Sequence, residues 1–331
     1  MKKTVLSGIR ATGRLHLGNY LGAVKGMLEL QDNPDYETFY MVADLHTITT
    51  PYDVEELKKN RREVIIDYLA AGLDPEKSVI FQQAEVPEHA ELAFYFSSVV
   101  TIARMQHLPT FKEKVKQYPD NATMALLNYP ILMSADILVY KAGLVPVGID
   151  QEPHLEISRV IANNMNSTYG TDFPEPVRFA TRGEYVPSLT GEGKMSKTVE
   201  GSFINITDDL ETIKSKIAKM PTDSGSGTIP TEGPEKGSAI GTVLSFVKLF
   251  QGEEKVEEYK KLYMSSGIRY GDLKKDLAEA IYEELKPLQE KRKELENNPE
   301  YVDKVIKEGA EKARAVAQKT MREVKEKMGL G

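Results

Sequence analysis

Residues 5–21, VLSGIRATGRLHLGNYL, run from an apolar segment through a glycine-containing turn into an amphipathic segment. The apolar part predicts a buried strand over residues 2–9. After the turn, apolar side chains recur at a helical spacing, at Leu21, Val24, Met27, Leu28 and Leu30. A strand that leads closely into a helix is the first half of a βαβ unit, so this stretch predicts an α/β fold.

The following segments continue the alternation of strands and helices. Residues 37–44 and 78–86 are apolar enough for two further buried strands. Residues 53–72 between them have the pattern of an amphipathic helix, with Asp53 as its N-cap and Gly72 at its end. Strands that are separated by helices pair in parallel, which predicts a doubly wound, Rossmann-like parallel sheet.

The middle of the chain, about residues 87–143, is expected to be a helical insertion with breaks at Pro109 and Pro130. The sheet is expected to resume at residues 144–148, before a helix that begins at Glu152. This insertion therefore lies within the α/β domain and not after it.

Beyond the sheet the pattern is helical, with helices expected over 243–251, 253–264, 272–296 and 299–328. Residues 222–242 are rich in Gly, Ser, Thr and Pro, and are expected to form a mobile loop. We predict a catalytic domain over residues 1–203 and an all-helical C-terminal domain over residues 204–331. The last helix of that second domain can pack back on the catalytic domain.

The composition excludes several classes of site. The 331 residues contain no cysteine, which rules out disulfides, thiolate metal sites and a cysteine nucleophile. No apolar run approaches the ~20 residues needed to span a bilayer, and the first residues lack the apolar stretch of a signal peptide. These features predict a cytoplasmic protein. A net charge of −7 means that any nucleic acid would be met by local basic clusters.

The turn after the first strand carries His16, Leu17, Gly18 and Asn19. In doubly wound sheets ligands bind at the carboxyl ends of the strands, where a helix N-terminus faces anionic phosphate. Gly18 lets a flat nucleotide approach the backbone, and His16 can donate to a phosphate oxygen. An ordinary strand-to-helix turn explains the same four residues when they are considered alone.

A second candidate is Lys194-Met195-Ser196-Lys197-Thr198, between glycines in the segment TGEGKMSKTVEG. Two lysines three residues apart can both reach the β- and γ-phosphates of ATP and follow the charge on departing pyrophosphate. A solvated basic loop is the alternative for these lysines alone. The combination with the HLGN turn is more specific than either motif, because both suit the same triphosphate.

These two motifs resemble the HIGH and KMSKS motifs of class I aminoacyl-tRNA synthetases. The chain is most similar to the bacterial tryptophanyl-tRNA synthetases, in the segments SGIRATGRLHLGNYLGA, YPILMSADILVY, LVPVGIDQ and EGAEKARAVAQKTMREVKEKMGL. The resemblance implies activation of L-tryptophan with ATP to tryptophanyl-adenylate and pyrophosphate, and then transfer to tRNA(Trp). It also implies a homodimer, and Mg²⁺ held by the ATP phosphates and not by protein side chains.

Asp136, in an apolar context, is the candidate residue for recognising the amino acid. The indole N–H is a donor without acceptor capacity, so one fixed carboxylate in an apolar pocket suits it. The resemblance gives Asp136 this role and Met133 the face of the ring; tyrosyl-tRNA synthetases usually carry Gln at the position of Met133. A helix cap is the alternative for Asp136 by itself. The same resemblance completes the amino-acid pocket with Tyr129, Gln151 and His46.

For ATP, the resemblance implies contacts with residues of four segments, namely Arg10, Ala11 and Thr12, Gly18 and Asn19, Gly148, Ile149 and Asp150, and Val186 with Lys194, Met195, Ser196, Lys197 and Thr198. His16, Lys194 and Lys197 are the expected catalytic groups. Three departures from the family pattern stand out. Arg10-Ala11-Thr12 replaces Gln-Pro-(Ser/Thr), so Arg10 meets phosphate or points to solvent; Ile149 replaces an acidic residue; and Thr198 replaces the final Ser.

Three alternative functions stay open at this point: a tyrosyl-tRNA synthetase, a nucleotidylyltransferase, and a tryptophan-binding paralogue that does not charge tRNA. The helical domain is expected to bind tRNA. Its candidate phosphate contacts are Lys274 and Lys275, Lys291, Arg292 and Lys293, and Arg314, Lys319 and Arg322, each of which also fits a solvated helix face. Residues 92–103 are the candidate dimer surface.

Overall fold

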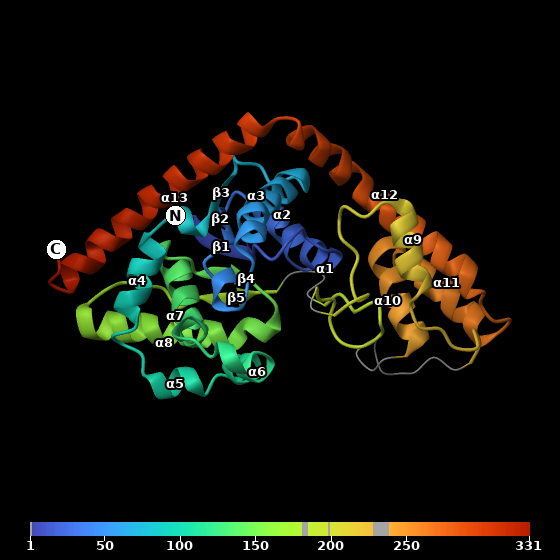
Figure 1. Ribbon diagram of the computed structural model, residues 1–331, viewed down its shortest axis with the longest axis horizontal. Coiled ribbons are helices and arrows are strands. Elements are labelled where there is room, and N and C mark those ends of the chain that lie inside the picture. Colours follow the sequence, from blue (N-terminus) through green and yellow to red (C-terminus); the bar gives the residue numbers. More distant parts are fainter. Residues whose placement is uncertain (1, 181–184, 198, 228–237) are drawn as a thin grey trace. The chain divides into compact units, whose positions relative to one another are not determined.

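The computed structural model describes residues 2–180, 185–197, 199–227 and 238–331. Its contacts divide the chain into two compact units (Figure 1). Unit 1 contains residues 1–13, 26–181 and 295–331, and unit 2 contains residues 14–25 and 182–294. The units are assembled from interleaved segments, so their limits differ from a single boundary at residues 203/204. The functional division of the chain at that boundary stays a prediction.

Unit 1 is built on a five-stranded sheet in the order β3-β2-β1-β4-β5. The strands are β1 (Lys3–Arg10), β2 (Tyr36–Ala43), β3 (Ser78–Gln82), β4 (Leu144–Pro146) and β5 (Val177–Phe179). Every neighbouring pair is parallel, and Val5 of β1 lies opposite both Thr38 and Leu144. This confirms the predicted α/β fold with a doubly wound parallel sheet.

Helices cover the sheet of unit 1 (Figure 1). They are α2 (Lys25–Gln31), α3 (Val54–Ala70), α4 (Glu88–Phe96), α5 (Ile102–Gln106), α6 (Pro109–Gln117), α7 (Met124–Val139), α8 (Glu152–Tyr169) and α13 (Pro299–Lys327), with short helical turns η2 (Thr47–Thr49), η3 (Gln83–Glu85), η4 (Pro119–Asn121) and η5 (Ile149–Gln151). Asp53 caps α3 as predicted, since its Oδ1 accepts the Glu56 N–H at 2.8 Å.

The prediction of a break at Pro130 was wrong. Pro130 is buried inside α7, and Asp136 is buried in the same helix and does not cap it. A proline removes one backbone hydrogen bond from a helix interior, but packing offsets that loss here. α7 lies against α4 on one side and α8 on the other, and ten of its residues are buried. Pro109 is instead the first residue of α6, a position that suits its fixed φ.

The core of unit 1 joins the sheet to α4, α7, α8 and α13. The C-terminal helix contributes Ala313, Ala317, Met321 and Val324 to this core. Gly309 lets α13 touch the backbone of β3, because a Cβ there would lie 1.7 Å from the Ile80 carbonyl oxygen. α13 therefore packs back on the α/β sheet.

Unit 2 contains α1 (Leu17–Asn19), the π-helical turn η1 (Tyr20–Val24), α9 (Leu210–Ala218), α10 (Ala239–Gln251), α11 (Glu253–Met264) and most of α12 (Tyr270–Glu296). α10, α11 and α12 end at the predicted residues, whereas α9 was not predicted. The predicted mobile loop 222–242 lies partly outside the described residues. The prediction was wrong for residues 239–242, which form the start of α10 after its cap Ser238. Among the described helices of both units, none is long and apolar enough to cross a membrane.

Candidate active site

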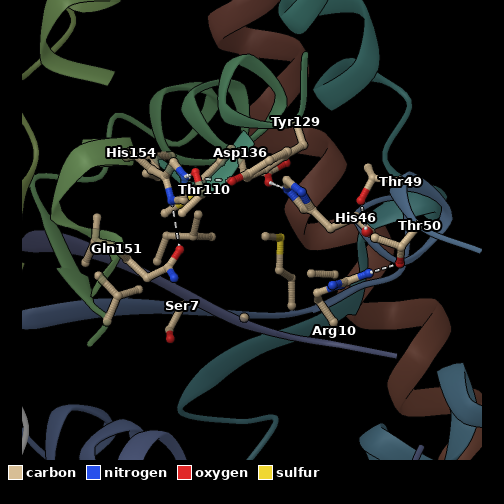
Figure 2. A pocket seen from close by; sticks show the side chains of 18 of the residues that line it. Ser7, Arg10, His46, Thr49, Thr50, Thr110, Tyr129, Asp136, Gln151 and His154 are labelled. Atoms are coloured by element: carbon tan, nitrogen blue, oxygen red, sulfur yellow. Dashed lines mark hydrogen bonds and ion pairs between the residues drawn. The ribbon is translucent and has the colours of Figure 1, made fainter. Parts of the chain in front are cut away.

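A cavity of about 370 Å³ lies in unit 1 (Figure 2). It opens where β1 and β2 end, and side chains of α6, α7 and α8 close it. Its volume suits a small molecule. The five residues predicted for the amino acid all line this cavity: His46, Tyr129, Met133, Asp136 and Gln151. Leu6, Met41, Val145 and Val147 supply an apolar wall.

Asp136 is fully buried in α7, and its carboxylate accepts from three side chains of other elements. Gln83 Nε2 donates to Oδ1 at 2.6 Å, and His89 Nδ1 lies 2.6 Å from the same oxygen. His46 Nε2 lies 2.7 Å from Oδ2. Burial opposes ionisation, but His46 and His89 outweigh it and lower the pKa of Asp136 to about 2. The group is therefore a fixed carboxylate at neutral pH.

His154 organises a second group of polar side chains in the cavity. Its Nε2 lies 2.8 Å from the Tyr129 hydroxyl and 2.9 Å from the Thr110 hydroxyl. Its Nδ1 lies 2.9 Å from Gln151 Oε1, while Gln151 Nε2 donates to Asp150. Burial and the nearby His46 lower the pKa of His154 to about 4, so the ring is neutral and holds Tyr129 and Gln151 in place.

Arg10, the last residue of β1, brings positive charge to the cavity. In Figure 2 it lies toward Thr50, whose hydroxyl accepts from its guanidinium at 2.9 Å, and apart from Gln151 and His154. Its Nε is buried without a hydrogen-bond partner among the described residues. Lys114 also lines the cavity, and burial and the charge of Arg10 lower the pKa of Lys114. This end of the cavity suits an anionic group, and Arg10 does not point to solvent.

The two sequence motifs meet in unit 2. His16 and Asn19 form a reciprocal cap at the start of α1, each side chain accepting from the other residue's backbone N–H at 3.3 Å. Leu17 N–H donates to the Ile204 carbonyl at 2.9 Å, and His16 pairs with Asn205. A Cβ on Gly18 would lie 3.4 Å from Met195 Cβ. The structure thus brings the HLGN turn and the lysine loop together.

The charges of this cluster act on His16. Burial and then the positive charges of Lys197 and Lys194 lower the pKa of His16 to about 4. The imidazole is therefore neutral at pH 7 and has both lysines near it. A neutral histidine beside two cations can donate a hydrogen bond to a phosphate without adding charge of its own.

Comparison with known proteins gives the family. A family model described as tRNA synthetases class I (W and Y) matches residues 2–286. The tryptophan–tRNA ligase of Rickettsia bellii is 42% identical over 335 residues, which covers 99% of this chain and 99% of the relative. That of Porphyromonas gingivalis is 39% identical over 330 residues, with 99% of each chain covered. The chain belongs to the tryptophanyl-tRNA synthetases.

Solved structures agree with this assignment. A tryptophanyl-tRNA synthetase from Campylobacter jejuni, complexed with ADP and tryptophan, has a TM-score of 0.84 at 34% identity and covers 99% of this chain and 100% of its own. One from Mycoplasma pneumoniae has a TM-score of 0.86 at 30% identity, with 100% and 99% covered. The activity is therefore that of an ATP-dependent ligase that joins tryptophan to tRNA. These comparisons favour this function over the three alternatives.

The residues that the synthetase resemblance assigns to ATP are divided between the two units. In unit 1, Ala11 donates its N–H to Thr47 Oγ1 at 3.1 Å, Thr12 is exposed, and Gly148 precedes η5. Ile149 is 68% exposed, and Asp150 beside it is also exposed.

In unit 2, the backbone carbonyl of Val186 accepts the Met195 N–H at 2.9 Å, and both side chains are buried. Ser196 is half-buried. Thr198 lies outside the described residues.

Sequence reasoning missed several polar residues, among them Gln83 and His89, which bind Asp136 from outside the cavity, and Thr110 and His154, which line it. A signal existed for the first two, since the segment QAEVPEH (residues 83–89) follows β3 at a carboxyl end of the sheet. No comparable signal marked Thr110 or His154. They reach the pocket from α6 and α8 only because those helices pack beside α7.

Two of the predicted tRNA contacts were wrong, because their side chains are buried. Lys274 donates to the Ala218 carbonyl at 2.9 Å and the Met220 carbonyl at 2.6 Å, which ties α12 to the end of α9. Arg292 is 3% exposed, and a buried cation cannot meet a phosphate backbone. Arg314 is half-buried and donates to the Glu85 carbonyl, and its contact with tRNA stays a prediction. Lys275, Lys293, Lys319 and Arg322 are exposed, and Lys291 is exposed beside Glu294.

The burial of His16 and the lysines near it predict a low pKa for its imidazole, which can be measured. In an NMR titration of the free enzyme, we expect the His16 imidazole to titrate at about pH 4, below the ordinary value of 6.5. Lys197→Ala should raise this midpoint without restoring 6.5, because burial is the larger cause. The unfolded chain binds this proton more readily, so His16 destabilises the fold as the pH falls from about 6.5 to about 4. A midpoint at 6.5 or above would contradict the proximity of the lysines.

Proposed function

We propose that the cavity of unit 1 is the L-tryptophan site and that Asp136 accepts the indole N–H. One observation carries this proposal. A carboxylate has about four acceptor positions, and three described side chains already donate to Asp136. Both positions of Oδ1 are used, whereas Oδ2 accepts from His46 alone among the residues that the structure describes. One acceptor position is left on a buried charge that lines an apolar cavity, which suits a single N–H donor.

The rest of the cavity fits the other parts of the amino acid. Met133 and the apolar wall can pack the faces of the indole ring. Tyr129 and Gln151, held by His154, supply polar oxygens for the ammonium group. Arg10 and Lys114 supply positive charge for the carboxylate and for the phosphate that it attacks.

We assign His16, Lys194 and Lys197 to the triphosphate of ATP, which Mg²⁺ accompanies as part of the substrate. A carboxylate oxygen of tryptophan attacks the α-phosphorus, and the bond from that phosphorus to the bridging oxygen of pyrophosphate breaks. The attacking group is already ionised, so the enzyme needs positioning and charge stabilisation and no strong base. The two lysines follow the charge that develops on pyrophosphate. A terminal ribose hydroxyl of tRNA(Trp) then attacks the acyl carbon, and AMP leaves.

The remaining parts of the proposal concern partners and location. The exposed basic residues of α12 and α13 are the candidates for tRNA phosphate contacts. For the homodimer, the supporting feature is a second, apolar cavity of about 320 Å³ between η2, α4 and α7, where Phe94 is 74% exposed and Ile48 43%. Tyr129 lines both cavities. The proposed location is the cytoplasm, where translation uses charged tRNA.

The test is the Asp136→Asn variant in tryptophan-dependent pyrophosphate–ATP exchange. The Asn amide has nearly the same shape as the carboxylate, but its NH₂ group replaces an acceptor oxygen with a donor that faces other donors. We expect kcat/KM for tryptophan to fall about 100-fold, which corresponds to the ~3 kcal/mol cost of leaving a buried polar group unsatisfied. The KM for ATP should stay within about threefold of the wild type, because Asp136 faces the amino acid alone. An unchanged kcat/KM for tryptophan would remove Asp136 from the pocket.

A further inference from the structure

Two buried side chains lie behind Asp136 and do not line the cavity. Gln83 (η3) and His89 (α4) are both fully buried, and both donate to Oδ1, the oxygen that lacks a remaining acceptor position. Neither touches the tryptophan cavity, so the proposed binding function leaves them without a role. A buried, titratable histidine on a functional carboxylate needs a specific explanation.

We propose that Gln83 and His89 are positioning residues that lock the Asp136 carboxylate with its one remaining acceptor position facing the pocket, and thereby set the preference for a substrate with an indole N–H. This inference rests on the proposed role of Asp136. It concerns specificity and assigns no contact with substrate to either residue.

The hydrogen-bond roles in this network follow from its ends. An ionised carboxylate only accepts, so His89 Nδ1 carries a hydrogen toward Asp136. At the other end, His89 Nε2 lies 2.8 Å from the Tyr140 hydroxyl. Burial, Asp136 and Glu88 raise the pKa of Tyr140 well above its ordinary value, so its hydroxyl keeps the proton that it donates. His89 is therefore held from both sides in one orientation.

Gln83 is fixed in the same way. Its Oε1 accepts the Leu45 N–H at 3.1 Å, which leaves its NH₂ group to donate to Asp136. Rotation of the Asp136 carboxylate would break the bonds to Gln83, His89 and His46 together. The network also favours the charged form, because hydrogen bonds donated to a carboxylate make it less readily protonated. A carboxyl group that rotated or took a proton would no longer offer an acceptor to the indole.

A matched pair of variants tests this inference. Asn places an amide nitrogen where His has Nδ1, and Leu has the same branching without any donor. We would compare His89→Leu with His89→Asn in pyrophosphate–ATP exchange, with L-tryptophan and with β-(benzothiophen-3-yl)alanine, in which sulfur replaces the indole N–H. The measured quantity is the ratio of kcat/KM for the two substrates.

We expect His89→Leu to lower this ratio about tenfold, the effect of losing one hydrogen bond to a charged group. His89→Asn should keep the ratio within about threefold of the wild type. Loss of a residue that serves packing alone would lower kcat/KM for both substrates by the same factor. An unchanged ratio in His89→Leu would therefore overturn the inference. Equal losses of the ratio in the Leu and Asn variants would overturn it as well, since the donor would then be irrelevant.

A second variant covers the case in which His89→Leu does not fold. Gln83→Met keeps the length of the side chain, removes the other donor to Oδ1, and should also lower the ratio about tenfold. Asp136→Asn separates this inference from the proposed function. If the ratio in Asp136→Asn equals that of the wild type, the proposed role of Asp136 is wrong. If the ratio falls in Asp136→Asn but is unchanged in the folded His89 and Gln83 variants, only the positioning inference is wrong.

Discussion

Lys197→Ala is expected to slow formation of tryptophanyl-adenylate by about 10²–10³-fold while changing the binding of ATP and tryptophan by much less. The range is that for removing one preorganised donor from developing negative charge. Lys197 lies close enough to His16 to lower the pKa of that histidine, so its charge acts where the HLGN turn and the lysine loop meet in unit 2. Charge accumulates on pyrophosphate as its bond to the α-phosphorus breaks, and a lysine there stabilises the transition state more than the ground state.

A single-turnover measurement of adenylate formation separates this effect from binding, because it yields the rate constant and the apparent dissociation constants from the same data. Lys197→Arg keeps the charge and should recover part of the rate. Lys260→Ala is the matched control in unit 2, since it removes one positive charge from α11, where Glu257 pairs with it at 2.7 Å. A rate constant for Lys197→Ala within threefold of the wild type would show that this lysine does not follow the pyrophosphate.

The sequence predicts those parts of the site that depend on local order. β1, the turn after it and the capped start of α1 are consecutive segments, so the place of His16 in the turn that follows β1 can be predicted from the chain itself. The lysine loop could be paired with that turn because both motifs suit one triphosphate. Its contact with Gly18 and the pairing of residues 16–17 with residues 204–205 are tertiary, and no periodicity predicts them.

The parts that could not be predicted depend on packing between distant helices. Asp136 alone resembled a helix cap, because an Asp after Ser-Ala is common there; the helix continues because both sides of α7 are buried. Gln83 and His89 are 53 and 47 residues away from it in the chain. β5 has three residues and a half-exposed pattern, too short for an alternation to be recognised. Packing likewise kept Pro130 within a helix.

The second large effect is expected for Gly309→Ala, a single methyl group on α13. Its Cβ would lie 1.7 Å from the Ile80 carbonyl oxygen and 2.8 Å from the carbonyl carbon. Both atoms belong to the backbone of a strand within the sheet, so neither can rotate away, and the helix must move off β3. We expect unit 1 to lose about 3 kcal/mol of stability, toward the upper end for overpacking. For a unit of this size, that lowers the melting temperature by about 6–12 °C.

Gly271→Ala is the matched control, because the same change in α12 meets no atom within 4 Å. There the methyl group should stabilise the helix by about 0.5 kcal/mol, so the two substitutions have opposite signs. Differential scanning calorimetry of both variants measures the difference. The consequence extends to the cavity that we propose for tryptophan, since β3 leads directly into η3 and Gln83. A melting temperature of Gly309→Ala equal to that of the wild type would mean that α13 does not rest on the sheet, and the donors behind Asp136 would lose the support of that helix.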